Sequence, residues 1–163
     1  MKFDIVIYGE QKLGTGPSES PKTKLFLDNK DGEPNWYFLP DGMWGLLDYD
    51  SDGPAFGYNL RAKGLQGDKD YDLIYYADPW PGNHPGKLIH TFHTQIDGSI
   101  PWTSGAVDIN LDLPNTADAN YPDGAKLWLV PSSDYAEPSL TAWNPTQYLF
   151  EANLITYNDS EVP

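Results

Sequence analysis

The sequence predicts an all-β domain folded as a β-sandwich, and three observations support that prediction. The 15 glycines and 15 prolines are scattered along the 163 residues and divide the chain into segments too short for long helices. Between these breaks, short segments rich in aromatic and β-branched residues recur, as in half-buried strands. Third, Leu65 precedes Tyr71 by six residues where one such segment begins, which is the spacing of a tyrosine corner.

A tyrosine corner is typical of immunoglobulin-like and fibronectin type III-like sandwiches, where the tyrosine hydroxyl bonds to the backbone of the loop before its strand. We therefore expect residues 1–163 to form a single antiparallel sandwich of this type, with one short helix near the C-terminus. The length fits one domain, and 39% hydrophobic residues are enough for a substantial core. The chain shows no internal repeat that would indicate a second domain.

The chain is predicted to begin with a strand, within residues 1–9, that is only loosely connected to the rest. The flexible connection over residues 10–22 contains glycines, prolines and small polar residues, and the main sandwich follows over residues 23–158. Little local structure determines which sheet edge the first strand joins. It either closes its own sheet, which costs less loop-closure entropy, or adds to a second copy and forms a homo-oligomer.

Further segments have the composition of strands. They are residues 24–27, 36–39, 44–49, 56–61, 71–76, 87–95, 105–113, 125–130 and 153–157. Residues 105–113 show the cleanest alternation of apolar and polar side chains, and residues 125–130 are apolar on both faces, which predicts a central strand. Asn144, Pro145 and Gln147 match an N-cap, a first helical position and a capping box, so the short helix is expected over residues 145–152.

Charge and composition exclude several classes of function. With 24 acidic and 10 basic side chains the formal net charge is -14, which would repel phosphate backbones, so no nucleic-acid partner is expected. The absence of cysteine excludes disulfides, thiolate metal sites and a cysteine nucleophile. No run of about 18 apolar residues is present, and the first residues read as a strand instead of a leader, so we expect no membrane span.

Four longer segments resemble those of a family of uncharacterised β-sandwich proteins from methanogenic archaea and some bacteria. They are residues 40–45, 73–82, 121–135 and 143–151, and the similarity extends over residues 24–157. The resemblance implies an exported or cell-surface protein, and thus an extracellular location. It implies no activity and no catalytic residues. Similar members tend to begin with a leader and often contain cysteines, whereas this sequence contains no cysteine.

Trp80 is the residue that the sequence indicates most strongly as a binding residue. It lies between two prolines in a loop, where an exposed indole could stack on a sugar or fill a protein pocket. Asp78 and Asn83 lie close by in the sequence and could supply polar contacts to the ligand. The alternative is that Trp80 folds back and covers the open end of the sandwich.

A second group of residues could bind calcium. Asp118, Asn120 and Asp123 lie in one loop that ends at Gly124, and their oxygens are ligands that calcium accepts. The alternative is an ordinary turn, because turns also favour aspartate and asparagine. No nucleophile elbow, phosphate loop or zincin motif is present in the sequence.

The leading functional hypothesis is therefore a non-catalytic cell-surface or extracellular module that binds or assembles with proteins or glycans. A carbohydrate-binding module that uses the Trp80 loop is the first alternative. An acidic glycoside hydrolase is the second, since such an enzyme needs only two carboxylates and the chain has many.

Overall fold

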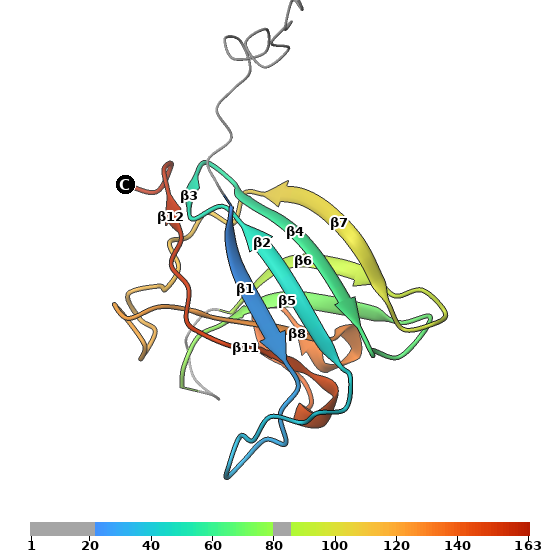
Figure 1. Cartoon of the computed structure of the whole chain (residues 1–163). Coiled ribbons are helices and arrows are strands. Elements are labelled where there is room, and N and C mark those ends of the chain that lie inside the picture. Colours follow the sequence, from blue (N-terminus) through green and yellow to red (C-terminus); the bar gives the residue numbers. More distant parts are fainter. Residues whose placement is uncertain (1–21, 80–85) are drawn as a thin grey trace, which may run out of the picture.

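The computed structural model describes residues 22–79 and 86–163, and this part of the chain is all-β (Figure 1). Its strands are β1 (Thr23–Asp28), β2 (Trp44–Tyr49), β3 (Asp52–Gly53), β4 (Phe56–Lys63), β5 (Asp70–Tyr76), β6 (Lys87–His93), β7 (Ile100–Val107), β8 (Lys126–Pro131), β9 (Tyr135–Ala136), β10 (Ser139–Leu140), β11 (Leu149–Glu151) and β12 (Asn158–Asp159). The described residues contain no α-helix, only the short 3-10 turns η2 (Ser132–Asp134) and η3 (Pro145–Gln147).

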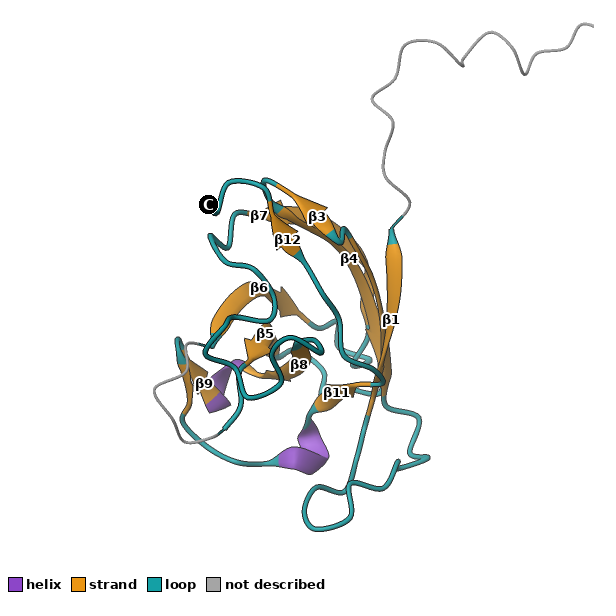
Figure 2. Ribbon diagram, turned by 90° about the vertical axis from the view of Figure 1, so that its left-hand side faces the viewer, coloured by secondary structure: helices purple, strands orange, loops and turns teal. Residues whose placement is uncertain are grey.

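Eight strands form one antiparallel sheet in the order β6-β5-β8-β11-β1-β2-β4-β7. The sheet is strongly curved and nearly closed, so that its edge strands β6 and β7 approach each other (Figure 1). Its two halves face each other as the layers of a sandwich do, but the β11–β1 ladder joins them into one sheet. Two short pairs, β9–β10 and β3–β12, lie beside it (Figure 2).

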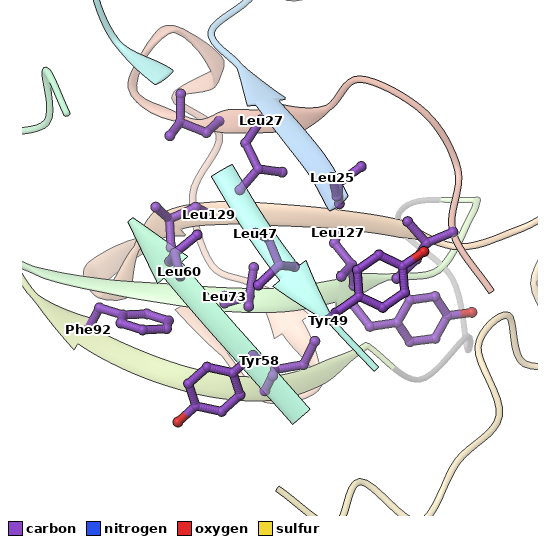
Figure 3. Packing of buried hydrophobic residues seen from close by; sticks show 14 of the residues in the cluster. Leu25, Leu27, Leu47, Tyr49, Tyr58, Leu60, Leu73, Phe92, Leu127 and Leu129 are labelled. Carbon is purple, nitrogen blue, oxygen red and sulfur yellow. The ribbon is translucent and has the colours of Figure 1, made fainter. Parts of the chain in front are cut away.

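The main core fills the space between the two halves of the sheet. Its largest members alternate along their strands, as period-2 patterning requires. Leu25 and Leu27 come from β1, and Leu47 from β2 faces Leu73 and Leu127 of the opposite half (Figure 3). All five side chains are fully buried. Residues 125–130 were predicted to form a central strand, and β8 is accordingly buried on both faces.

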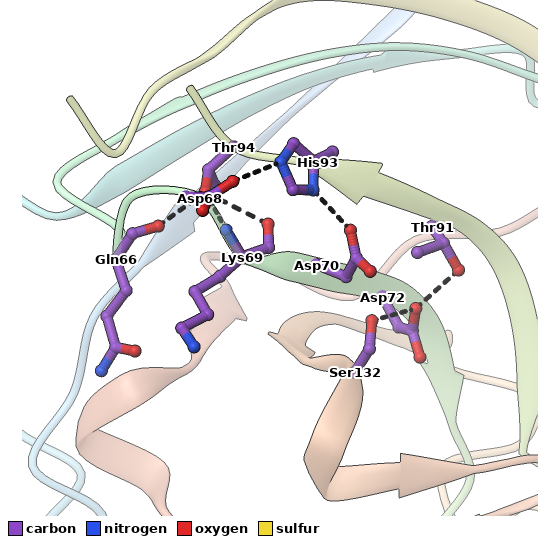
Figure 4. Close-up of polar contacts among 9 residues, drawn as sticks. All are labelled: Gln66, Asp68, Lys69, Asp70, Asp72, Thr91, His93, Thr94 and Ser132. Carbon is purple, nitrogen blue, oxygen red and sulfur yellow. Dashed lines mark hydrogen bonds and ion pairs between the residues drawn. The ribbon is translucent and has the colours of Figure 1, made fainter. Parts of the chain in front are cut away.

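The tyrosine corner is present in the structure. The Tyr71 hydroxyl oxygen accepts a hydrogen bond of 3.1 Å from the backbone N–H of Gln66, in the loop that precedes β5. Thr94 ties the same loop to β6, because its hydroxyl donates to the Gln66 carbonyl at 2.6 Å (Figure 4). His93 lies between two carboxylates, Nδ1 at 2.7 Å from Asp70 and Nε2 at 3.1 Å from Asp68, and these contacts raise its pKa.

The predicted helix over residues 145–152 is wrong. Only residues 145–147 turn, as η3, and the chain then continues as β11 between β8 and β1. Asn144 makes no side-chain cap on this turn. The ladder hydrogen bonds that residues 149–151 make to two neighbouring strands compensate for the helical bonds that the local sequence favours.

Three predicted strands also differ from the structure. Residues 36–39 belong to the loop between β1 and β2 and make only an isolated bridge at Phe38. Of the strand predicted at 105–113, only residues 105–107 belong to β7, which begins earlier, at Ile100, and ends at Val107, where its partner β4 begins opposite it at Phe56. Residues 153–157 make isolated bridges at Ile155 and Tyr157. The strand predicted within residues 1–9, and its proposed exchange between copies, lie outside the described residues.

A second hydrophobic cluster covers the outer face of β5, β8 and β11. It is formed by side chains that alternate with those of the main core, together with residues of the segment 135–148; its members include Ile74, Tyr76, Trp128, Val130, Tyr135, Leu140, Tyr148 and Phe150. The main core and this cluster lie on opposite faces of the same strands, which is why β5 and β8 are buried on both faces. Across the described part of the chain, no helix is long and apolar enough to cross a membrane.

Candidate functional site

A cleft opens beside the second hydrophobic cluster, on the outer face of the sheet. Its volume is about 760 Å³, which lies in the range of ligand pockets. We call it the aromatic cleft, and it is lined by Lys30, Glu33, Trp36, Tyr76, Asp78, Pro79, Lys126, Trp128, Trp143, Phe150 and Glu151. These residues come from β5, β8, β11, the segment directly after β5 and the loops that precede β2 and η3.

The inner part of the aromatic cleft is built by three neighbouring strands. Tyr76 of β5 stacks on Trp128 of β8 with ring centroids 3.9 Å apart. Phe150 of β11 lies opposite Trp128 in the ladder and meets its ring edge-on at 4.9 Å. Because strand pairing determines these positions, the three rings form a rigid surface.

Trp36 and Trp143 line the cleft from two loops and are 36% and 43% exposed. Their ring centroids are 5.9 Å apart, and Trp36 also meets Phe150 edge-on at 5.3 Å. Trp36 has a φ of 55°, a left-handed conformation that costs energy for a bulky side chain. Such strain is found preferentially at functional sites.

The loop that carries Trp143 is anchored by buried polar groups. The Tyr148 hydroxyl donates to Asp134 at 2.7 Å and accepts from the backbone N–H of Asn144 at 3.0 Å. The Asn144 side-chain amide donates to the same Asp134 carboxylate at 2.9 Å. Asp134 is buried and Trp143 precedes Asn144 directly, so the indole is held in place before any ligand arrives.

Glu151 is the carboxylate with unusual chemistry in the cleft. The indole Nε1–H of Trp128 donates to Glu151 Oε2 at 2.6 Å. Burial raises the pKa of Glu151 to about 7, although Lys126 and Lys30 lower it in part. Glu151 is therefore largely protonated in mildly acidic solution and can donate a hydrogen bond or a proton there.

Asp78, one of the three predicted ligand-binding residues, lines the cleft, but its carboxylate contacts other side chains. Lys126 Nζ is 2.5 Å from Asp78 Oδ2, and the Asn120 amide donates to the same oxygen at 2.7 Å. The bond from Asn120 joins Asp78, in the segment after β5, to the loop that contains Asp118. Trp80 and Asn83, the other two predicted ligand-binding residues, lie outside the described residues.

Of the three predicted calcium ligands, the structure brings two together. Asp118 is buried and accepts hydrogen bonds from the Tyr75 hydroxyl at 2.6 Å and from Asn120 N–H at 2.9 Å. Asp123 is exposed, and its backbone N–H closes a turn on the Asn120 carbonyl. The described residues contain no group of three or more histidine or carboxylate side chains placed to hold a metal ion. This geometry favours a structural role for Asp118.

Trp36 and Trp143 were not among the binding residues predicted from the sequence. The signal that could have found them is the one that singled out Trp80, a tryptophan among turn residues. Pro34-Asn35 precedes Trp36, and Asn144-Pro145 follows Trp143. Trp36 and Trp143 expose apolar ring surface above the buried inner rings, with their planes at 67° to each other, while Glu33, Glu151 and two lysines offer polar contacts. No family model, curated protein or solved structure matches this chain.

Proposed function

We propose that this protein is a non-catalytic binding module that holds a carbohydrate in the aromatic cleft. The observation that carries the proposal is the pair of exposed indoles, Trp36 and Trp143, at a cleft that also contains carboxylates and lysines. The C–H faces of a sugar ring stack on indole, and its hydroxyl groups both donate and accept hydrogen bonds. A lining of flat apolar walls and mixed polar groups matches both properties.

Exposed aromatic surface continues beyond the cleft, which favours a ligand longer than one sugar. Tyr37 and Phe38 follow Trp36 in the same loop and are 65% and 59% exposed. Exposed aromatic side chains next to a pocket are characteristic of interaction sites. The ligand would then be an oligosaccharide or polysaccharide that lies across the loop and enters the cleft.

Two finer predictions belong to this proposal. The bond from Gln66 to Tyr71 and the two facing halves of the sheet support the immunoglobulin-like or fibronectin-like assignment. The family resemblance at residues 40–45, 73–82, 121–135 and 143–151 supports an extracellular or cell-surface location, where glycans are abundant. A protein ligand in place of a glycan is the alternative.

Binding to a glycan array, followed by titration of each hit with intrinsic fluorescence, tests the proposal. Trp36→Ala and Trp143→Ala should each weaken binding about tenfold or more, which is the usual effect of removing a central aromatic contact. Tyr121→Ala is the control, because Tyr121 is an aromatic residue that is 51% exposed and lines neither the cleft nor the hollow beside Arg61. Binding that survives both cleft substitutions, or an array with no hit, would contradict the proposal.

The protonated state of Glu151 supports one second candidate, an acidic glycoside hydrolase. Such an enzyme needs a carboxylic acid that protonates the leaving oxygen and a second carboxylate. Glu151, with its raised pKa, suits the first role, and Asp78 or Glu33 are the other carboxylates in the cleft. Turnover of a glycoside panel that Glu151→Gln abolishes would support this candidate, while binding without turnover by the wild type would exclude it.

A further inference from the structure

Arg61 is the only arginine in the chain, and in the described structure it makes no hydrogen bond or ion pair. It lies on β4, partly buried, and its Nε is fully covered without an acceptor. A chain with 24 acidic side chains offers many carboxylates to a guanidinium. A guanidinium donor that loses its bound water without gaining another acceptor destabilises the folded state. The absence of a carboxylate partner for Arg61 within the described residues therefore calls for an explanation.

Two tryptophans hold the guanidinium from the neighbouring strands. Its central carbon lies 5.1 Å from the Trp44 ring centroid on β2 and 4.9 Å from the Trp102 ring centroid on β7. Stacking of this kind uses the faces of the planar group, so that, although Nε is covered, the terminal Nη donors at its edge stay available. The side chain is therefore oriented without an ion pair to any carboxylate of residues 22–79 and 86–163, as a preorganised anion-binding group would be.

A β-bulge places Trp102 against Arg61. Leu60 pairs with Thr103 and Ala62 pairs with Ile100, so two residues of β7, Pro101 and Trp102, lie opposite Arg61 alone. Bulges redirect side chains and are frequent beside binding sites. Here the bulge brings an indole that is 45% exposed next to the cation.

A hollow of about 520 Å³ adjoins the stacked group. Arg61, Lys63, Trp102, Ile100 and Pro101 line it, together with Ala62, Gly64, Asp97 and Ser99. Two cationic side chains and one carboxylate give this hollow a local positive charge in a strongly acidic chain. Asp97 accepts hydrogen bonds from the Ser99 hydroxyl at 2.6 Å and from the Ser99 N–H at 3.0 Å, and these bonds together with the nearby Lys63 lower its pKa, so its charge is balanced by Lys63 and Arg61 keeps the unbalanced positive charge.

We propose that this hollow binds a small organic acid whose carboxylate pairs with the Arg61 guanidinium and whose apolar face packs on Trp102. A guanidinium matches a carboxylate with two parallel hydrogen bonds, and Lys63 adds a second positive charge. The apolar walls at Ile100 and Pro101 select an acid with an apolar body over a bare inorganic anion. The site lies over β4 and β7, whereas the aromatic cleft lies over β5, β8 and β11, so it does not depend on the proposed glycan binding.

Titration with benzoate, followed through the indole N–H resonances, tests the proposal. Benzoate should give saturable shifts of Trp102 and Trp44, and neutral benzyl alcohol should give none. Phosphate should bind much more weakly than benzoate, and glucuronate should show whether a polar body is tolerated. Phosphate binding as tight as benzoate binding would overturn the preference for an organic acid, and no saturable shift with any of these acids would overturn the site.

Variants that change one feature at a time complete the test. Arg61→Gln should weaken benzoate binding at least tenfold, and Arg61→Lys should restore only part of it, because lysine keeps the charge but loses the planar pair of donors. Lys69→Gln is the charge-matched control on an exposed residue outside the hollow. Equal binding by Arg61→Gln and Lys69→Gln, with both variants folded, would contradict the role of Arg61.

Discussion

Replacement of Glu151 by glutamine should make the protein more stable at neutral pH and leave it unchanged in acid. Burial raises the pKa of the Glu151 carboxyl in the folded protein from 4.5 to about 7. Below pH 4.5 the carboxyl group is mostly protonated in both the folded and the unfolded chain, so its ionisation does not change the free energy of unfolding. As the pH rises to 7, the unfolded chain loses its proton first, and the free energy of unfolding falls.

The size of the effect follows from the two pKa values. They differ by about 2.5 units, and each unit corresponds to about 1.4 kcal/mol, so the ionised carboxylate should cost about 3 kcal/mol of stability above pH 7. Glutamine has nearly the same shape, can still accept the Trp128 Nε1 hydrogen bond and stays neutral. Glu151→Gln should therefore not show the loss of stability that the ionised carboxylate causes in the wild type.

Urea denaturation of the wild type and Glu151→Gln at pH values from 4 to 8 is the assay. Subtraction of the two curves removes the pH dependence that the other acidic groups share. The difference in free energy of unfolding should be near zero at pH 4 and should rise to about 3 kcal/mol at pH 8. Glu161→Gln, at an exposed position, is the matched control and should show little change. A pH-independent difference for Glu151→Gln would refute the reasoning.

Three further outcomes are expected. Tyr71→Phe should lower the free energy of unfolding, measured by urea denaturation, by about 1 kcal/mol, because the Gln66 N–H loses its acceptor. A variant as stable as the wild type would contradict a stabilising role for this tyrosine corner. Asp118→Ala should lower the free energy of unfolding by about 2 to 3 kcal/mol, because the buried Tyr75 hydroxyl loses its acceptor. A decrease smaller than that of Tyr71→Phe would contradict a structural role for Asp118. If the loop of Asp118, Asn120 and Asp123 binds calcium, millimolar calcium should raise the melting temperature, and Asp123→Ala should abolish that rise. A melting temperature that calcium does not change would show that the loop is an ordinary turn.

Local patterns in the sequence predicted much of the β structure. Strand β2 was predicted with its observed bounds, and β1, β4, β5 and β8 were predicted within one or two residues at each end. Alternation of side chains and turn residues acts over a few neighbouring residues, so it can be recognised without the fold. The Tyr71 corner belongs to the same class, because its partner Gln66 is only five residues away.

Errors arose where a distant partner decided the local structure. Residues 149–151 carry helix-starting signals before them, yet ladders to β8 and β1 make them a strand. Residues 36–39 have strand composition but no long ladder to join. Residues 108–113 keep their alternation, with Ile109 and Leu113 buried, although their strand has ended because β4 begins at Phe56.

By itself, the sequence determined the β class, most strand positions and the acidic, cysteine-free character of the chain, because these depend on composition and short-range periodicity. The residues that come together in the two proposed sites were determined by the tertiary structure alone. The aromatic cleft joins Trp36, Trp128 and Trp143, and the Arg61 site joins three strands with a bulge between two of them. Strand order and register unite residues that are far apart in sequence, and nothing in the local pattern specifies which strands become neighbours.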